Sequence, residues 1–429
     1  RPSILLDSGA DSLIYGMGEK PVVELAERLK RQQTQMDAPS FKKLIADIPQ
    51  MVYLDKEVVV QEGDITLFSH EECLKDKKKE AANFRHIEEE SNKYTASRIL
   101  QKSGKLTVVV NPPYPPLTEA ELDRSFDLPY TRLPHPKYKG KRIPAYDMIK
   151  FSVNLHRGCF GGCAFCTISA HQGKFIVSRS KESILKEVKA ITELPDFKGY
   201  LSDLGGPSAN MYRMKGRDEA VCRKCKRPSC IYPKVCPNLN TDHRPLLDIY
   251  HAVDALPGIK KSFIGSGIRY ELIARHVSGR LKVAPEHTSD RVLNIMRKPP
   301  FSQFGEFKKI FDRINHEEGL RQQLIPYFIS SHPGCKEEDM AELAVITKRL
   351  DFHLEQDFTP TPMTVATEAW YTGFHPYTLE PVFSAKTQRE KLAQRQFFFW
   401  YKPEERRNII NELRRIGRTD LIDKLYGKR

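Results

Sequence analysis

Six short β-rich runs alternate with helix patterns in the middle of the chain, and this alternation restricts the fold more than any other feature of the sequence. The runs are "IKFSVN" (149–154), "GYLSDL" (199–204), "KSFIGS" (261–266), "RLKVA" (280–284), "LIPYFIS" (324–330) and "FHLEQDF" (352–358). Strands that alternate with helices pair in parallel through right-handed crossovers. The pattern predicts an α/β fold whose centre is a partial, open (β/α)6 barrel of the TIM type, with functional residues after the C-terminal strand ends.

The regions on either side of these runs differ in pattern, which places boundaries near residues 145 and 358. Residues 1–145 contain a strand at 12–16, an amphipathic helix at 19–32, a long charged helix pattern at 77–103 and a helix opened by a capping box at 118–121. We interpret 1–145 as an α/β remnant and linker, 146–358 as the barrel and 359–429 as a helical C-terminal extension. The basic helices of this extension either close the barrel or offer an RNA-binding surface.

Composition and charge narrow the class of protein. The 429 residues carry a net charge of +14, which permits an anionic partner such as RNA, although solvated helix faces are the commoner cause of such charge. No apolar stretch is long enough to span a membrane and nothing at the start resembles a signal peptide, so we expect a cytoplasmic protein. Nine cysteines in such a chain predict reduced thiols and metal binding. Because the chain does not begin with Met, we expect it to be a piece of a longer protein.

Three cysteines follow the first barrel strand, in the loop "HRGCFGGCAFC" (156–166). Soft thiolates select zinc, copper(I) or iron-sulfur clusters. Cys159, Cys163 and Cys166 are one ligand short of a closed 4Fe-4S site, so one iron would keep an open coordination position. The alternative is a zinc site completed by His156 or His171, although zinc ligands normally come in paired sets.

The Cys-x3-Cys-x2-Cys spacing, with Phe165 before the last cysteine, resembles the motif of the radical S-adenosylmethionine (SAM) superfamily. The resemblance implies that SAM chelates the open iron of a 4Fe-4S cluster. An electron delivered by a reductant such as flavodoxin or ferredoxin then splits SAM into methionine and a 5'-deoxyadenosyl radical, which abstracts a hydrogen atom from the substrate. The same resemblance implies that Cys159, Cys163 and Cys166 bind the cluster.

Other strand ends carry residues that resemble the cofactor-binding positions of this superfamily. Gly205 and Gly206 resemble its Gly-Gly-Glu turn, but Pro207 replaces the Glu, so Asp203 or a backbone carbonyl would have to serve. After the third run, Ser266 and Arg269 are candidates for the SAM ribose or carboxylate, although Gly265 and Gly267 fit a simple turn equally well.

The fourth and fifth runs end in "APEHTSD" and "YFISSHPGCKEEDM", which parallel stretches of tRNA methylthiotransferases. Glu286 and His287 are candidate polar groups of the active site, and Glu286 is assigned to cofactor binding. A single His is more often structural. Cys335 either faces the substrate or is a buried small residue.

As a set, "PAYDMIKFSVNLHRGCFGGCAFCTI", "SDLGGPSANMYRM", "APEHT" and "LIPYFISSHPG" are similar to the YgiQ-like group of radical SAM proteins. Members generally carry an N-terminal region that resembles a cobalamin-binding domain. Residues 1–32 resemble its last strand and helix, which leaves cobalamin open as a cofactor of the full-length protein. The resemblance supplies no substrate.

A second cysteine set, "CRKCKRPSCIYPKVC", contains Cys222, Cys225, Cys230 and Cys236 between the second run and its helix. Four thiols in one loop can close a tetrahedral site, and the basic neighbours stabilise thiolates. We expect a second metal centre here, either structural zinc or an auxiliary 4Fe-4S cluster. Cys73 is isolated and expected to be structural.

The leading hypothesis is therefore a radical SAM enzyme acting on an unknown substrate. An RNA-modifying enzyme related to the methylthiotransferases is the nearest alternative, and bound tRNA with salt-dependent affinity would favour it. A non-catalytic iron-sulfur scaffold and a zinc-stabilised nucleic-acid-binding module are alternatives from other classes.

Overall fold

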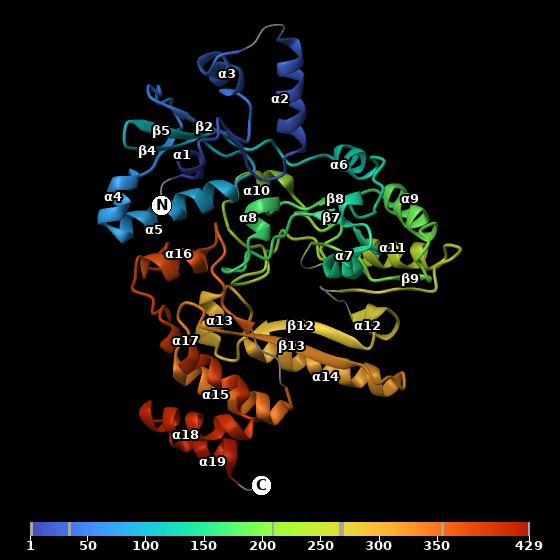
Figure 1. The fold of residues 1–429 in the computed structure, drawn as a ribbon. Coiled ribbons are helices and arrows are strands. Elements are labelled where there is room, and N and C mark those ends of the chain that lie inside the picture. The colour runs from blue at the N-terminus through green and yellow to red at the C-terminus, as the bar shows by residue number, and fades with distance from the viewer. Residues whose placement is uncertain (1–2, 33–35, 208–209, 266–269, 353–355, 428–429) are drawn as a thin grey trace.

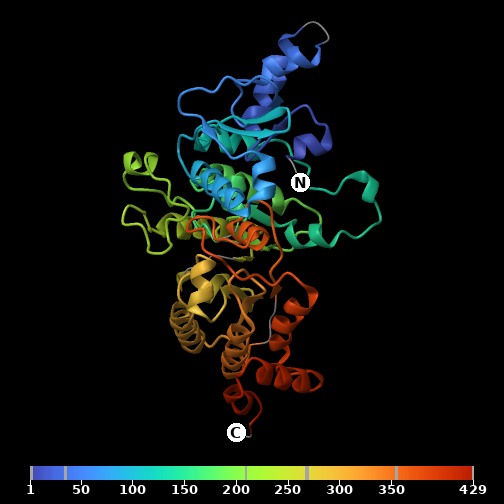
Figure 2. The ribbon, with the colours of Figure 1, turned by 90° about the vertical axis from the view of Figure 1, so that its left-hand side faces the viewer.

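The computed structural model describes residues 3–32, 36–207, 210–265, 270–352 and 356–427. Figure 1 shows an N-terminal sheet at one end, the short parallel strands and their helices in the middle, and the C-terminal helices at the other end. The view in Figure 2, turned by 90°, shows the same order along the long axis. Among the described residues, no helix is both long and apolar enough to cross a membrane.

The N-terminal region is built on a five-stranded sheet in the order β1-β2-β5-β4-β3. Three of its four pairings are antiparallel and only β3–β4 is parallel. Its strands are β1 (Leu13–Ile14), β2 (Met51–Asp55), β3 (Ile65–Thr66), β4 (Ile99–Ser103) and β5 (Leu106–Val110). Its helices and those of the following linker are α1 (Ile4–Ser8), α2 (Glu19–Arg31), α3 (Ala38–Ile45), α4 (His70–Lys75), α5 (Lys77–Ser91), α6 (Glu119–Phe126), the 3-10 turn η1 (Pro136–Tyr138) and α7 (Pro144–Ile149).

Most of the elements expected in this region form, with one error. The strand at 12–16, the helix at 19–32 and the capping box of α6 are present. The prediction of one helix over 77–103 is wrong, because α5 ends at Ser91 and residues 99–103 form β4. Ile99 and Leu100 of β4 are buried by pairing with β5, a contact distant in sequence that helical periodicity does not register.

All six β-rich runs of the central region contain a strand. They are β6 (Ser152–Asn154), β9 (Tyr200–Leu201) continued by β10 (Asp203–Gly205), β11 (Lys261–Ser262), β12 (Arg280–Glu286), β13 (Gln323–Ser330) and β14 (Gln356–Asp357). The intervening helices are α8 (Ile168–Gln172), α9 (Lys181–Thr192), α10 (Glu219–Arg223), α11 (Arg244–Asp254), α12 (Tyr270–His276), α13 (Asp290–Ile295), α14 (Phe301–Glu317) and α15 (Glu337–Leu350). A small antiparallel pair, β7 (His156–Arg157) with β8 (Val177–Ser178), follows β6. The α/β class is confirmed.

Every pairing among the six runs is parallel and joins neighbours in sequence, but the ladders do not form one continuous barrel. β6 pairs with β10, β9 with β11, β12 with β13, and β13 with β14. In the described part of the chain no ladder joins the third run to the fourth, so the partial TIM barrel is not confirmed. Among the described residues of the third run, only the two-residue β11 is a strand, which leaves little strand edge for β12 to pair with.

The C-terminal region consists of α16 (Val365–Thr372), α17 (Gln388–Arg395), α18 (Arg406–Arg415) and α19 (Asp420–Tyr426), with 3-10 turns η2 (Gln396–Phe399) and η3 (Pro403–Glu405). Its apolar residues share one core with β13 and α15, in which Phe328, Met340, Phe397 and Leu413 are fully buried. The helical extension is therefore packed against the last strands of the central region.

Candidate functional site

The three-cysteine loop begins directly after β6 and β7, where the backbone folds tightly. Gly158 and Gly162 have positive φ values of 89° and 61°. A Cβ atom at Gly158 would lie 2.5 Å from the carbonyl oxygen of Phe175, and one at Gly162 would lie 2.3 Å from that of Pro228. Only glycine fits at either position, because both the conformation and the space exclude a side chain.

The loop brings the three cysteines into one electrostatic environment. Cys163 interacts with both Cys159 and Cys166, and the amide of Gly161 donates to Cys159 Sγ over 3.4 Å. Burial raises the pKa of Cys159, and it raises the pKa of Cys163 to about 11, while the ammonium of Lys298 acts in the opposite direction on both. Cys159 and Cys163 thus lie near a cation that favours their thiolate form.

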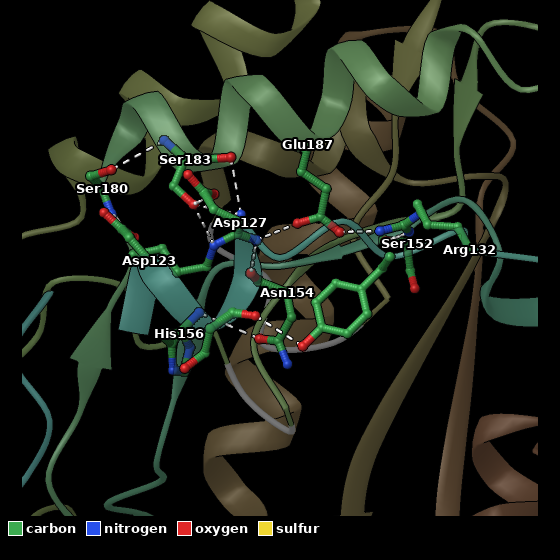
Figure 3. Close-up of polar contacts among 12 residues, drawn as sticks. Asp123, Asp127, Arg132, Ser152, Asn154, His156, Ser180, Ser183 and Glu187 are labelled. Atoms are coloured by element: carbon green, nitrogen blue, oxygen red, sulfur yellow. Dashed lines mark hydrogen bonds and ion pairs between the residues drawn. The ribbon is translucent and has the colours of Figure 1, made fainter. Parts of the chain in front are cut away.

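A buried ion pair fixes the strand that precedes the loop. Arg179 is fully buried, pairs with Glu187 of α9 and donates to the backbone oxygen of Asn154 over 3.0 Å. Figure 3 shows Ser183 and Glu187 of α9 facing Asn154. Arg132 from the linker pairs with the same Glu187. These contacts hold β6, and hence the start of the loop, against α9.

Segments from both ends of the chain cover the loop. Thr361 donates its hydroxyl to the carbonyl of Phe165 over 3.1 Å, and the amide of Ala366 donates to that of Ala164 over 2.8 Å. Phe165 itself packs edge-on against His332. A cavity beside the thiols is lined by residues of α5, the loop, α8, the segment between α10 and α11, and the C-terminal segment: Phe84, Glu88, Gly162, Cys163, Cys166, Ser169, Pro228, Met363 and Thr364.

Glu88 of α5 makes side-chain contacts with two other segments near the loop. It pairs with Arg297 over 2.7 and 3.0 Å and accepts from the Tyr377 hydroxyl over 2.6 Å. The N-terminal helix, the segment after α13 and the C-terminal region therefore meet next to the cysteine loop. The sequence patterns did not indicate this three-way contact, which joins positions more than 200 residues apart.

The glycine turn after the second run lies beside the cysteine loop. The amide of Leu155 donates to the carbonyl of Gly205 over 2.8 Å, which links the two strand ends. Asp203 accepts from the amide of Gly265 over 2.8 Å, and burial raises its pKa. A Cβ at Gly205 or at Gly265 would lie 3.0 Å from the Asp203 carboxyl group. Asp203 thus lies between two glycine turns, with Gly206 next in the chain.

Glu286 is the last residue of β12. It lies close to Lys298, the lysine that also interacts with Cys159 and Cys163. Its φ is 68°, a conformation that costs a non-glycine residue about 1–3 kcal/mol. Burial raises its pKa to about 7, and Lys298 Nζ lies 3.7 Å from its Oε1. Lys298 was not predicted as a site residue.

The remaining candidates are buried or lie outside the described residues. His287 is fully buried, its Nδ1 accepts from the amide of Ser289 over 3.0 Å, and burial lowers its pKa to about 3. Cys335 is also fully buried, with its sulfur 3.5 Å from His287 Nε2. Ser266 and Arg269 lie outside the described residues.

The second cysteine set packs against the first. Cys230 donates its amide to the carbonyl of Phe160 over 3.0 Å. Cys159 and Phe160 share an apolar cluster with Cys230 and Cys236. The two motifs, separated in sequence by more than 50 residues, therefore form one region of the molecule.

The cysteines of the loop differ in their fit to the metal groups expected from the sequence. Across the described ranges, no three His, Cys, Asp or Glu side chains are gathered closely enough to hold a metal ion as they lie. His156 Nε2 accepts from the amide of Met211 over 2.9 Å, so this nitrogen is engaged elsewhere. The soft donors, the tight glycine-folded loop and the adjacent Lys298 fit an iron-sulfur cluster bound by Cys159, Cys163 and Cys166.

Comparison with known proteins identifies the family of the chain. Residues 1–152 match the family model described as "Radical SAM N-terminal", and residues 354–429 match a domain of unknown function, DUF3362. The chain is thus a radical SAM protein, an enzyme whose substrate the matches do not specify.

More particularly, the chain belongs to the UPF0313 family, the YgiQ-like group. It is 76% identical to a UPF0313 protein of Bacteroides thetaiotaomicron, over 100% of this chain and 74% of that protein. It is 63% identical to a UPF0313 protein of Porphyromonas gingivalis, over 100% of this chain and 70% of that protein. A solved structure of the radical SAM methyltransferase TsrM from Kitasatospora setae, with cobalamin and a 4Fe-4S cluster bound, aligns with a TM-score of 0.45 at 14% identity. The alignment covers 85% of this chain and 56% of that one.

Proposed function

We propose that Cys159, Cys163 and Cys166 hold a 4Fe-4S cluster and that the chain cleaves SAM reductively to start radical chemistry on a substrate. The observation that carries the proposal is the placement of three mutually interacting thiols in one buried, glycine-folded loop directly after the first parallel strand. When bound, such a cluster supplies the electron that splits SAM into methionine and a 5'-deoxyadenosyl radical, which abstracts a hydrogen atom.

The residues around the loop have distinct tasks in this proposal. Lys298 stabilises the thiolates of Cys159 and Cys163 electrostatically. The segment containing Thr361 covers the loop and excludes water from it, which protects a reactive radical from side reactions. Phe165 packs edge-on against His332 within this covered region.

The SAM-binding side is proposed to lie at the adjacent strand ends. Gly205 and Gly206 leave their backbone groups accessible to the methionyl amine, and Asp203 supplies the nearby carboxylate. Glu286 is proposed to contact the cofactor next to Lys298. We also assign Ser266 and Arg269 to SAM on the family resemblance alone.

The partners and the domain division stay predictions. We expect a flavodoxin or ferredoxin as reductant and a cytoplasmic location, and we keep boundaries near 145 and 358. RNA binding and cobalamin in the full-length protein are expectations of the same kind.

Anaerobic reconstitution with iron and sulfide tests the proposal. The Cys163→Ala variant should lose about one cluster per chain, whereas Cys73→Ala, which removes a buried thiol outside the loop, should lose none. Addition of SAM should change the electron paramagnetic resonance signal of the reduced cluster in the wild type and in Cys73→Ala only. An unchanged signal in a fully loaded wild type contradicts the proposal.

A further inference from the structure

The insertion between β10 and α11 gathers four free cysteines: Cys222, Cys225, Cys230 and Cys236. Each is partly buried. Cys222 interacts electrostatically with Cys225 and Cys236, and Cys230 interacts with all three. The four sulfur atoms therefore share one small region of the insertion.

Polar donors already face this region. The amide nitrogen of the Asn238 side chain donates to Cys222 Sγ over 3.3 Å. Lys174 Nζ lies 3.8 Å from Cys225 Sγ and donates to the carbonyl of Arg227 over 2.8 Å. Such hydrogen bonds to sulfur are typical of the groups that orient and stabilise metal-bound thiolates.

Of these donors, Lys174 most strongly indicates a bound anion, because it is only 3% exposed. A buried ammonium is expensive unless an anion compensates it. Within the described residues no carboxylate lies at ion-pair distance from Lys174. Its ammonium contacts Cys225 Sγ, the Arg227 carbonyl and the face of the Phe175 ring. A metal bound by four thiolates carries a net negative charge for either zinc or a 4Fe-4S cluster, so it supplies the missing anion.

The same insertion is docked on the three-cysteine loop. The carbonyl of Pro228 occupies the space that a side chain at Gly162 would take, and the Ser229 hydroxyl donates to the Phe160 carbonyl over 3.4 Å. Together with the bond from the Cys230 amide to the Phe160 carbonyl, these contacts join the insertion to the loop.

We infer that Cys222, Cys225, Cys230 and Cys236 bind a second, thiophilic metal centre, with Lys174 as its buried counter-charge, and that this centre braces the loop carrying Cys159 and Cys163. Binding of zinc, or of an already assembled 4Fe-4S cluster, replaces the four S–H protons by metal–sulfur bonds and releases the protons to solvent, without any change of oxidation state. Since the sulfur atoms are not gathered at ligand distance as they lie, the inference includes their closing onto the metal.

The first test uses the full chain with Cys159→Ala, Cys163→Ala and Cys166→Ala combined, so that its outcome is independent of the proposed SAM chemistry. Reconstituted separately with zinc and with iron plus sulfide, this variant should retain either about one zinc ion or about four irons per chain. Iron with the absorbance of a cluster identifies an auxiliary cluster, and zinc identifies a structural ion. A folded variant that retains neither metal overturns the inference.

Lys174→Met tests the counter-charge, with Lys181→Met as the matched control. Lys181 lies on the surface and pairs with Asp248. In competition with a chelator, Lys174→Met should weaken binding of the retained metal by about 10- to 100-fold, as expected for loss of a group that orients the ligands. Lys181→Met should leave it unchanged. Equal metal affinity in the two variants refutes the role of Lys174.

The bracing role predicts a separate signal. Amide hydrogen exchange of residues 158–163 should become faster when chelator removes the second metal from the triple variant, whereas exchange in β12 should not change. Exchange in 158–163 that is unaffected by the metal would show that the centre does not brace the loop.

Discussion

The contact between Gly162 and Pro228 makes a quantitative prediction for Gly162→Ala. The added Cβ would meet the Pro228 carbonyl oxygen at 2.3 Å and its carbon at 2.9 Å, at a φ of 61°. Left-handed backbone costs an alanine about 1–2 kcal/mol. The steric overlap with a backbone carbonyl, which cannot rotate away, adds about 1–3 kcal/mol.

Gly104→Ala separates these two contributions. Gly104 has a nearly identical φ of 59°, and a Cβ there would meet nothing within 4 Å. The backbone cost and the change in unfolded-chain entropy are therefore shared by both variants, and only the overlap differs.

Urea unfolding of both variants, followed by circular dichroism, measures the difference. Gly162→Ala should lose about 1–3 kcal/mol more free energy of unfolding than Gly104→Ala. It should also retain less iron after reconstitution, because the cysteine loop is displaced. Equal losses in the two variants, with equal iron content, would refute the claim that the two cysteine motifs are in fixed contact.

Three further predictions concern stability. Glu187→Gln should lower the free energy of unfolding by about 3–5 kcal/mol, because Arg179 would be left buried without its partner carboxylate; the exposed Glu193→Gln should have almost no effect in the same thermal denaturation experiment. Burial raises the pKa of Glu368 from 4.5 to about 8, so between these pH values the folded state holds a proton that the unfolded state releases. The free energy of unfolding of the wild type should therefore fall as pH rises from 4.5 to about 8. Glu368→Gln should remove this fall, and identical pH profiles would contradict the assignment. Thr118→Ala should cost about 1 kcal/mol through loss of the α6 capping box, and no measurable change would argue that the cap is unimportant.

Local patterns predicted the elements that local forces determine. The capping box at Thr118 and the amphipathic helix at 19–32 form as expected, because their hydrogen bonds and apolar spacing are contained in a few neighbouring residues. The six β-rich runs each contain a strand with parallel pairing. The assignment of residues 99–103 to a helix was wrong because β4 is determined by its pairing with β5. The partial, open barrel is not confirmed, since no ladder among the described residues joins β11 to β12.

For the candidate site, too, the sequence indicates the residues that lie close together in the chain and misses those that only the fold brings close. Cysteine spacing predicts Cys159, Cys163 and Cys166 as the cluster ligands because all three lie in one loop, and this assignment stays a prediction. Lys298, Lys174 and the covering segment at Thr361 were missed, since their importance depends on contacts that only the folded chain creates. In the sequence, each of these lysines is one among 69 basic residues.

The most direct test of the central claim is the formation of 5'-deoxyadenosine. The protein is reconstituted anaerobically with iron and sulfide, reduced with dithionite and incubated with SAM, beside Cys163→Ala prepared in the same way. The account predicts 5'-deoxyadenosine from the wild type and none from the variant. A fully loaded wild type that forms no 5'-deoxyadenosine, and whose cluster signal SAM does not change, would contradict it.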